Sequence, residues 1–184
     1  DRAIELPSAN GAVAAYLDHD AVVAALKEAG ADAVWPGWGF VAEDSVFVDR
    51  LTAEGIEFCG PSGEAMRSLG DKITSKRLAE HAGVPVTDWS GGELADESHA
   101  EREASRIGYP VVLKATAGGG GRGIRIVEKA EEIAEAFRSA QSEAVNAFGN
   151  GVLFVEAMVT GGRHIEVQVA ADKHGHARAF GCRD

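Results

Sequence analysis

One stretch, residues 109–127, constrains the fold of this chain more than any other. A valine-rich apolar run ends in Lys114, and five glycines and an arginine follow. Residues 124–127 then read Ile-Arg-Ile-Val, in which an arginine lies between two isoleucines. Short apolar runs bounded by glycine or proline are typical of β-strands. The stretch therefore predicts an antiparallel hairpin in which Lys114 lies on the first strand and the glycines form the connection.

Two well-known phosphate-binding motifs do not explain this loop. Gly118, Gly120 and Gly123 fit the spacing G-x-G-x-x-G. The dinucleotide fingerprint, however, requires a helix directly after the glycines, and here a strand pattern follows. A P-loop carries its lysine after the glycines, whereas Lys114 precedes them.

We therefore expect a hairpin whose glycine tip folds over a polyphosphate. The backbone N–H groups of the glycines would form an anion-binding nest, and Lys114 would be a fixed cation beneath it. The alternative is a flexible hairpin tip without a ligand. A two-residue turn would suffice for that purpose, and ordering five glycines is costly in conformational entropy, so the phosphate-binding interpretation is favoured.

Composition limits the partners of the chain. Its 184 residues allow one domain or two small ones, and its net charge is -11. A chain this acidic is a poor general binder of nucleic acid or anionic membrane, so an anionic substrate needs a local cationic site, for which Lys114, Arg122 and Arg125 are candidates. No apolar run approaches transmembrane length. Cys59 and Cys182 are isolated, which indicates reduced thiols in a cytoplasmic protein.

Residues 1–60 alternate between helix and strand patterns. We expect a helix over 21–29 capped by Asp20, a short buried strand over 33–35, a helix from Asp44 or Ser45 to about 53, and a strand over 56–59. This order implies a parallel sheet with crossover helices. The turn at 36–40 lies where such sheets bind ligands, but this segment alone favours a plain strand-to-helix turn without a ligand.

Residues 61–86 predict a helical linker. Two helices separated at Gly70 are expected, with Asp71 as the N-cap of the second, followed by a brief strand at 84–86. Lys72, at the start of the second helix, is placed to reach an anionic ligand, but a solvated lysine is the more common outcome at such a position.

Residues 87–158 predict a small α+β unit. A capping box at 98–101 should begin a helix that ends at Ile107, and the glycine hairpin, a helix over about 131–147 and a strand over 152–155 follow. From 164 onwards, His164, Glu166 and Gln168 alternate with apolar residues, which predicts a half-buried strand, a turn at 172–175 and a returning strand. These three polar residues line a site only if that sheet forms the floor of a nucleotide cleft.

Taken together, these landmarks resemble the biotin carboxylase component of biotin-dependent acyl-CoA carboxylases, a member of the ATP-grasp superfamily. The matching segments occur in order over nearly the whole chain, at 36–43, 60–62, 70–72, 82–86, 107–110, 114–123, 142–149 and 163–169. The resemblance implies a mixed α/β and α+β fold. Residues 1–60 would be part of a parallel-sheet N-terminal (pre-ATP-grasp) domain, 61–86 a helical linker, 87–158 the ATP-grasp lid domain with its glycine-rich loop, and 159–184 the first strands of the C-terminal ATP-grasp domain.

The resemblance also implies a chemistry. In this family of ligases, ATP and bicarbonate form carboxyphosphate, and carbon dioxide from it is transferred to N1 of biotin on a carrier. The resemblance implies that two lysines contact the phosphates, that the glycine loop is a mobile lid over them, that residues from Glu156 onwards lie at the adenine end, and that a histidine contacts the nucleotide. The ATP-contacting positions in this chain would be Lys72, Lys114, Gly119, Gly120, Gly121, Arg122, Gly123, Glu156, Ala157, Val159 and His164. The Mg²⁺-binding carboxylates and the bicarbonate and biotin sites are expected after Asp184, so no catalytic or metal-ligating residue is expected within the chain.

Two positions depart from the family pattern. Ala157 stands where the family commonly has lysine, and Trp38 replaces the more common tyrosine. The resemblance implies two partners, a biotin carboxyl carrier domain and a carboxyltransferase, and a homodimer or larger complex. The role implied for this complex is in fatty acid metabolism. Neither nucleic acid nor a membrane is expected as a partner. The alternatives are the biotin carboxylase part of a pyruvate, propionyl-CoA or urea carboxylase, another ATP-grasp ligase of the carbamoyl-phosphate synthetase type, and a non-catalytic ATP-grasp scaffold.

Overall fold

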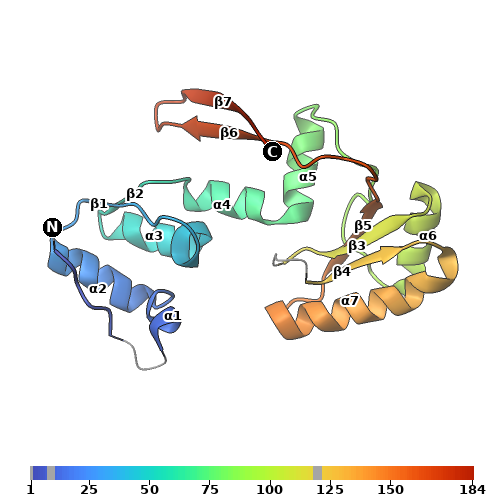
Figure 1. Ribbon diagram of the computed structural model, residues 1–184, viewed down its shortest axis with the longest axis horizontal. Coiled ribbons are helices and arrows are strands. Elements are labelled where there is room, and N and C mark those ends of the chain that lie inside the picture. Colours follow the sequence, from blue (N-terminus) through green and yellow to red (C-terminus); the bar gives the residue numbers. More distant parts are fainter. Residues whose placement is uncertain (1, 8–10, 118–121) are drawn as a thin grey trace. The chain divides into compact units, whose positions relative to one another are not determined.

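The computed structural model describes residues 2–7, 11–117 and 122–184. The chain divides into two compact units, Asp1–Val86 and Thr87–Asp184 (Figure 1). Among the described residues, no helix combines the length and the apolar character that crossing a membrane requires.

The first unit contains a two-stranded parallel sheet. Strand β1 (Ala33–Val34) pairs with β2 (Glu57–Phe58), and the 3₁₀ helix η1 (Phe40–Glu43) and helix α3 (Ser45–Ala53) lie between them in the chain. The predicted parallel pairing is therefore confirmed. Helices α1 (Ala12–Ala15) and α2 (His19–Ala29) precede the sheet. The core of this unit gathers around α3, where Phe47 and Leu51 are fully buried.

Two local expectations for residues 18–35 were wrong. Helix α2 is capped by Asp18 and not by Asp20, because Asp18 has extended backbone angles and its carboxylate accepts hydrogen bonds from the N–H groups of Asp20 and Ala21. The segment 33–35 is not a buried strand: Ala33 is exposed, and Trp35 lies outside β1 with most of its surface in solvent. Two short strands are too small a sheet to cover this segment.

The helical segment follows the predicted division. Helix α4 (Gly63–Gly70) is followed by α5 (Lys72–His81), and the side chain of Asp71 caps α5 by accepting from the N–H of Thr74 at 2.7 Å. The expected strand at 84–86 does not form. The N–H of Val84 instead donates to Ala79 at the end of α5, and Pro85 has no N–H to contribute to a strand.

The second unit is built on a three-stranded antiparallel sheet with the order β4–β3–β5. Its strands are β3 (Val111–Ala115), β4 (Ile124–Val127) and β5 (Leu153–Ala157), so the predicted hairpin around the glycines is confirmed. Helices α6 (Glu97–Ile107) and α7 (Ile133–Phe148), the latter preceded by the 3₁₀ helix η2 (Ala130–Glu132), pack on one face of the sheet (Figure 1). Alanines of both helices and apolar residues of the strands form the core.

The start of α6 differs from expectation. Asp96 caps this helix by accepting from the N–H of His99 at 2.7 Å, so the predicted capping box at 98–101 is wrong. Asp96 is fully extended, as an N-cap must be, whereas Ser98 already lies inside the helix.

The last strands form a hairpin of their own. Strand β6 (Glu166–Ala171) pairs antiparallel with β7 (Ala177–Arg183), and the carboxylate of Asp172 accepts from the N–H groups of His174 and His176 in the predicted turn. The predicted half-burial was wrong, because every residue of β7 and all of β6 except Glu166 are exposed. A register shift between Val167 and Val169 also interrupts the strict alternation, and His164 precedes the strand.

Candidate nucleotide site

The face of the β4–β3–β5 sheet opposite α6 and α7 carries the candidate site. Side chains alternate along a strand, and Val111, Leu113 and Ala115 of β3 are in the core. The other side chains of β3 therefore lie on the opposite face, and the pairing register adds their neighbours on β4 and β5. This open face consists of Val112, Lys114, Ile124, Ile126, Phe154 and Glu156.

An ion pair joins two strands on the open face. The ammonium group of Lys114 donates to one carboxylate oxygen of Glu156, and Thr87 Oγ1 donates to the other at 3.1 Å. The Glu156 side chain is only 11% exposed, against 31% for Lys114. Burying a carboxylate is unfavourable unless it is paired and hydrogen-bonded, so these two contacts explain why a glutamate is tolerated here.

Trp89 packs beside β5, next to Glu156 and Phe154. It is buried, its backbone forms a bridge with Glu156, and its ring meets that of Phe154 edge-on at 6.1 Å between centroids. Its carbonyl oxygen accepts from Arg106 of α6 at 2.6 Å. The segment around Trp89 is thus packed against β5, where its backbone bridge lies beside Glu156.

The remainder of the open face is apolar. Val112 is half-buried, while Ile124 and Ile126 on β4 are exposed at 37% and 55%. Branched side chains beside a fixed charge pair suit a ligand that has a flat apolar part and a charged part. Sequence reasoning missed these three residues as site candidates. The period-two pattern together with the position of Lys114 could have identified them, once the strand pairing was known.

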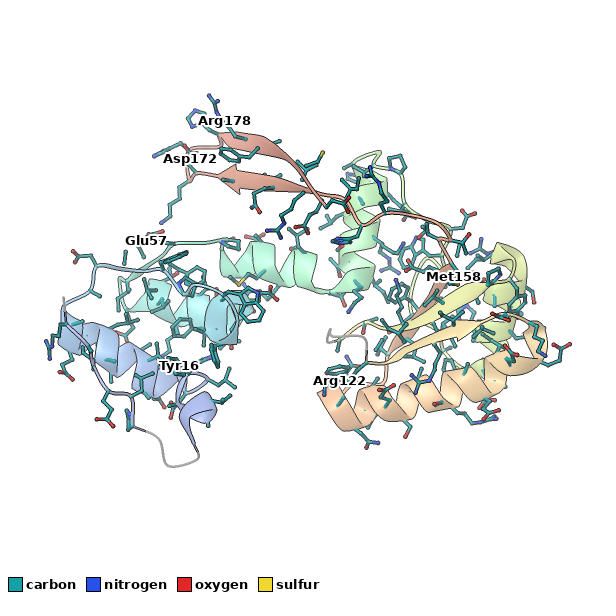
Figure 2. The ribbon with its side chains drawn as sticks, in the orientation of Figure 1. Tyr16, Glu57, Arg122, Met158, Asp172 and Arg178 are labelled. Carbon is teal, nitrogen blue, oxygen red and sulfur yellow. The ribbon has the colours of Figure 1, made fainter. Side chains whose placement is uncertain are left out.

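The end of the glycine loop is held tightly against the sheet. Gly123 is buried with φ +68°, and a Cβ on it would approach the Cβ of Ala115 to 2.7 Å. Its carbonyl oxygen accepts from the N–H of Ala115 at 2.9 Å. The neighbouring Arg122 guanidinium lies 5.2 Å from the ring centroid of Phe148, at the C-terminal end of α7 (Figure 2). The predicted contacts Gly119, Gly120 and Gly121 lie outside the described residues.

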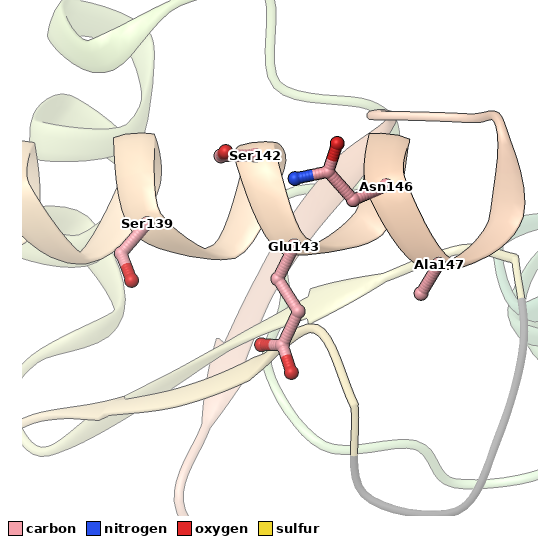
Figure 3. A pocket seen from close by; sticks show the side chains of 5 residues that line it. All are labelled: Ser139, Ser142, Glu143, Asn146 and Ala147. Carbon is pink, nitrogen blue, oxygen red and sulfur yellow. The ribbon is translucent and has the colours of Figure 1, made fainter.

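Arg125 does not belong to the open face, contrary to its expected role in a cationic site. Its side chain points to α7, where Nη1 donates to Glu143 at 2.8 Å and Nη2 donates to Ser139 Oγ at 3.1 Å. The Arg125 hydrogen bond, a bond from the backbone N–H of Gly123 and the charges of Arg125 and Arg122 hold the pKa of the Glu143 carboxyl below its usual value. Figure 3 shows Glu143 extending from α7 on the side of the hairpin.

The other predicted residues are spread more widely. Ala157 ends β5 opposite Val111, with its N–H donating to Asp88. Val159 and His164 are exposed in the segment between β5 and β6. Lys72 is the first residue of α5 and belongs to the first unit. The structure therefore brings Lys114 and Glu156 into direct contact and places Arg122 and Gly123 at the near end of β4.

Two family models together match almost the whole chain. Residues 1–66 match the model described as biotin carboxylase, N-terminal domain, and residues 71–184 match the model described as carbamoyl-phosphate synthase L chain, ATP binding domain. Among curated relatives, the propionyl-CoA carboxylase alpha chain of Ruegeria pomeroyi is 45% identical over 92% of this chain. The biotin carboxylase of Halalkalibacterium halodurans is 45% identical over 88% of it.

Solved structures agree in fold. The biotin carboxylase–βγ-ATP complex from Campylobacter jejuni has a TM-score of 0.87 and 46% identity, covering 90% of this chain and 37% of that one. The biotin carboxylase domain dimer of 2-oxoglutarate carboxylase from Hydrogenobacter thermophilus, in complex with MgADP, ADP and bicarbonate, has a TM-score of 0.90 and 42% identity, covering 95% and 39%.

The chain is shorter than these relatives. It spans 25% of the length of the Ruegeria protein and 36% of the Halalkalibacterium protein. The matches nevertheless cover both units in order, and the open face described above falls inside the matched ATP-binding domain. The chain belongs to the biotin carboxylase family of ATP-grasp proteins.

Proposed function

We propose that this chain supplies part of the ATP site of a biotin carboxylase. In the proposed reaction, ATP and bicarbonate form carboxyphosphate, and its carbon dioxide is transferred to biotin on a carrier domain. The single observation that carries the proposal is the open face, where Lys114, paired with Glu156, adjoins the apolar side chains of Val112 and Ile124. The adenine ring would pack on the apolar part, and Lys114 would turn to the phosphates.

The chemistry of phosphoryl transfer supports this assignment. The protein mainly positions the reacting groups and neutralises charge, for which lysine side chains and backbone N–H groups are suited. Two solved relatives contain a nucleotide, one as a βγ-ATP complex and one with MgADP, ADP and bicarbonate. We extend these ligands to this chain and propose Lys72, Arg122, Gly123, Ala157, Val159 and His164 as further contacts of the nucleotide.

Magnesium accompanies ATP in this proposal. Among the described residues, no group of three or more histidine, cysteine, aspartate or glutamate side chains could hold a metal ion. We therefore assign no residue of this chain to the metal. When bound, Mg²⁺ would neutralise phosphate charge, while Lys114 holds the phosphates from the sheet.

The wider assignment follows from the kind of relatives. We propose that biotin is presented by a carboxyl carrier domain, that a carboxyltransferase uses the carboxylated biotin, and that the enzyme works as a dimer in the cytoplasm, in acyl-CoA and fatty acid metabolism. Support comes from the carboxylase subunits among the relatives and from the dimer in the Hydrogenobacter structure.

The test is Lys114→Ala in a protein of the relatives' full length that contains these 184 residues. The rates of bicarbonate-dependent ATP cleavage and of biotin carboxylation should both fall. The loss should correspond to roughly 2–4 kcal/mol of transition-state stabilisation, the scale for losing one charged stabiliser. Lys129→Ala is the matched control, because this exposed lysine lies outside the open face and pairs locally with Glu132. Equal rates for both variants would remove Lys114 from the mechanism.

A further inference from the structure

A short segment of the second unit, residues 87–94, runs along one edge of β5. The N–H of Ala157 donates to the carbonyl of Asp88 at 2.8 Å. Further along, the N–H of Ser90 donates to the carbonyl of Val155 at 2.9 Å. Strand β3 pairs with the other edge of β5. The backbone of the segment is therefore held in register with β5, so the side chains that it brings to the open face start from defined positions.

Thr87 brings a hydroxyl group from this segment to the ion pair. Its Oγ1 donates to Oε2 of Glu156 at 3.1 Å, while the ammonium group of Lys114 donates to Oε1. The last torsion angle of a glutamate side chain is only weakly restricted, so the carboxylate has little orientational preference of its own. A donor on each oxygen, one from β3 and one from the segment, therefore sets the plane of the Glu156 carboxylate.

This arrangement bears on how Lys114 can meet a phosphate. An ammonium group has three N–H donors, so Lys114 can keep one on Glu156 and direct the others to a second anion. A largely buried carboxylate oxygen that loses its hydrogen bond is unfavourable, and the ammonium group already on the other oxygen can supply a replacement. Both oxygens of Glu156 would then draw on Lys114, which would leave it less able to bind the phosphate.

We propose that Thr87 is a positioning residue for the nucleotide site. Its hydroxyl holds one oxygen of Glu156 and so leaves donors of Lys114 to the phosphates of ATP. The inference rests on the function proposed above. Thr87 acts through Glu156 and does not bind the nucleotide itself, so the hydroxyl is the required part of its side chain.

Two substitutions separate the hydroxyl from the shape of the side chain. Thr87→Val removes the hydroxyl and keeps the branched shape, whereas Thr87→Ser keeps the hydroxyl. The affinities of MgATP and adenosine are measured by calorimetry in a protein of the relatives' full length that contains these 184 residues. Thr87→Val should weaken MgATP by about fivefold, part of the value of one hydrogen bond to a charged group, and Thr87→Ser should stay within about twofold of the wild type. Adenosine should bind all three proteins alike, because it has no phosphate for Lys114.

A double-mutant cycle tests whether Thr87 acts through Lys114. Lys114→Met should itself weaken MgATP. Adding Thr87→Val to Lys114→Met should cause no further loss, because the group that transmits the effect is already gone. A general structural defect caused by Thr87→Val would instead add its own loss in both backgrounds.

Ser90→Ala provides the matched control. Ser90 Oγ donates to the carbonyl of Gly92 at 2.7 Å and accepts from the N–H of Val155 at 3.3 Å. This variant therefore removes hydroxyl contacts of the same segment that do not involve Glu156, and it should leave both affinities unchanged.

The possible failures are distinguishable. Wild-type affinity for MgATP in Thr87→Val, equal losses of MgATP and adenosine, or an undiminished loss in the Lys114→Met background would overturn the role of Thr87. If Lys114→Met weakens MgATP while Thr87→Val does not, only this inference fails. If Lys114→Met binds MgATP as tightly as the wild type, the proposed function fails, and the inference fails with it.

Discussion

Glu156, almost fully buried on β5, accepts a hydrogen bond from the ammonium group of Lys114 on the neighbouring strand β3. Lys114 lies opposite Phe154 in the register, so the ion pair is diagonal across the sheet, a spacing that long side chains reach. The pair gives Lys114 a fixed position. Under the proposed function, a phosphate would share this ammonium group with Glu156, so nucleotide binding and the stability of the sheet would depend on the same two side chains.

Removing the lysine alone should destabilise the fold more than removing both charges. Lys114→Met removes the ammonium group that pairs with Glu156 and keeps the hydrogen bond from Thr87. We expect a loss of about 1–2 kcal/mol in the free energy of unfolding, below the value for a fully buried pair because Lys114 is partly exposed. Urea unfolding measures this loss. Lys114→Met combined with Glu156→Gln should recover most of it. A double variant as unstable as the single one would show that the carboxylate is not the source of the loss.

Gly123 should not tolerate a side chain. Gly123→Ala combines a left-handed backbone with a Cβ placed 2.7 Å from that of Ala115, and we expect a loss of roughly 2–4 kcal/mol in unfolding free energy. Gly149→Ala is the control, because Gly149 has φ +70° but nothing within 4 Å of the added Cβ. It should lose only about 1 kcal/mol from backbone strain. Equal thermal unfolding midpoints for the two variants would rule out the steric part of the argument.

The glycine hairpin could be predicted from sequence because its determinants are local. The position of Lys114, the glycines and the period-two pattern of residues 124–127 lie within one short stretch. The division of the helices at Asp71 was predictable for the same reason. N-caps were less so, because two acceptors compete within a few residues, as Asp18 and Asp20 do. The extended backbone that decides between them is set by the preceding chain.

Contacts between distant segments escaped prediction. Arg125 was expected to face an anionic ligand, yet it is held by Glu143, and nothing in the spacing of these residues reveals that contact. Similarly, the alternation in β6 predicted half-burial, but burial depends on which other segment covers a strand, and a single strand pattern does not contain that information.

The apolar part of the open face should contribute to nucleotide affinity without contributing to stability. Ile124→Asn should weaken MgATP and adenosine alike by about tenfold, because both ligands carry the adenine that we place on this residue. Its unfolding midpoint should change little, since Ile124 is already partly exposed. Val145→Asn, at an exposed position of α7 on the other side of the sheet, is the control and should leave both affinities unchanged. A loss confined to MgATP would place the adenine elsewhere.

The cap of α3 should make the first unit sensitive to acid. One oxygen of Asp44 accepts from the N–H groups of Val46 and Phe47, and the other lies 2.8 Å from Nε2 of His19. Partial burial alone would raise the pKa of Asp44. Three hydrogen bonds, from the N–H of Phe47, the His19 ring and the N–H of Val46, act in the opposite direction, as does the charge of His19. Together they bring the pKa of Asp44 below the usual value of 3.8.

The sign of the pH effect follows from this lowered pKa. Because folding lowers the pKa of Asp44, its carboxylate stabilises the folded state fully above the unfolded value of 3.8, and this contribution is lost as the pH falls through the lower folded-state value. Asp44→Asn keeps a capping oxygen and removes the charge. It should therefore be less stable than the wild type by about 0.5–1 kcal/mol at pH 6, and the difference should disappear as the pH falls through the lowered folded-state pKa. His19→Gln should reduce the difference at pH 6, because it removes one of the groups that favour the charged carboxylate. A difference between wild type and Asp44→Asn that stays constant from pH 6 to pH 2.5 in urea unfolding would contradict the assigned role of the charge.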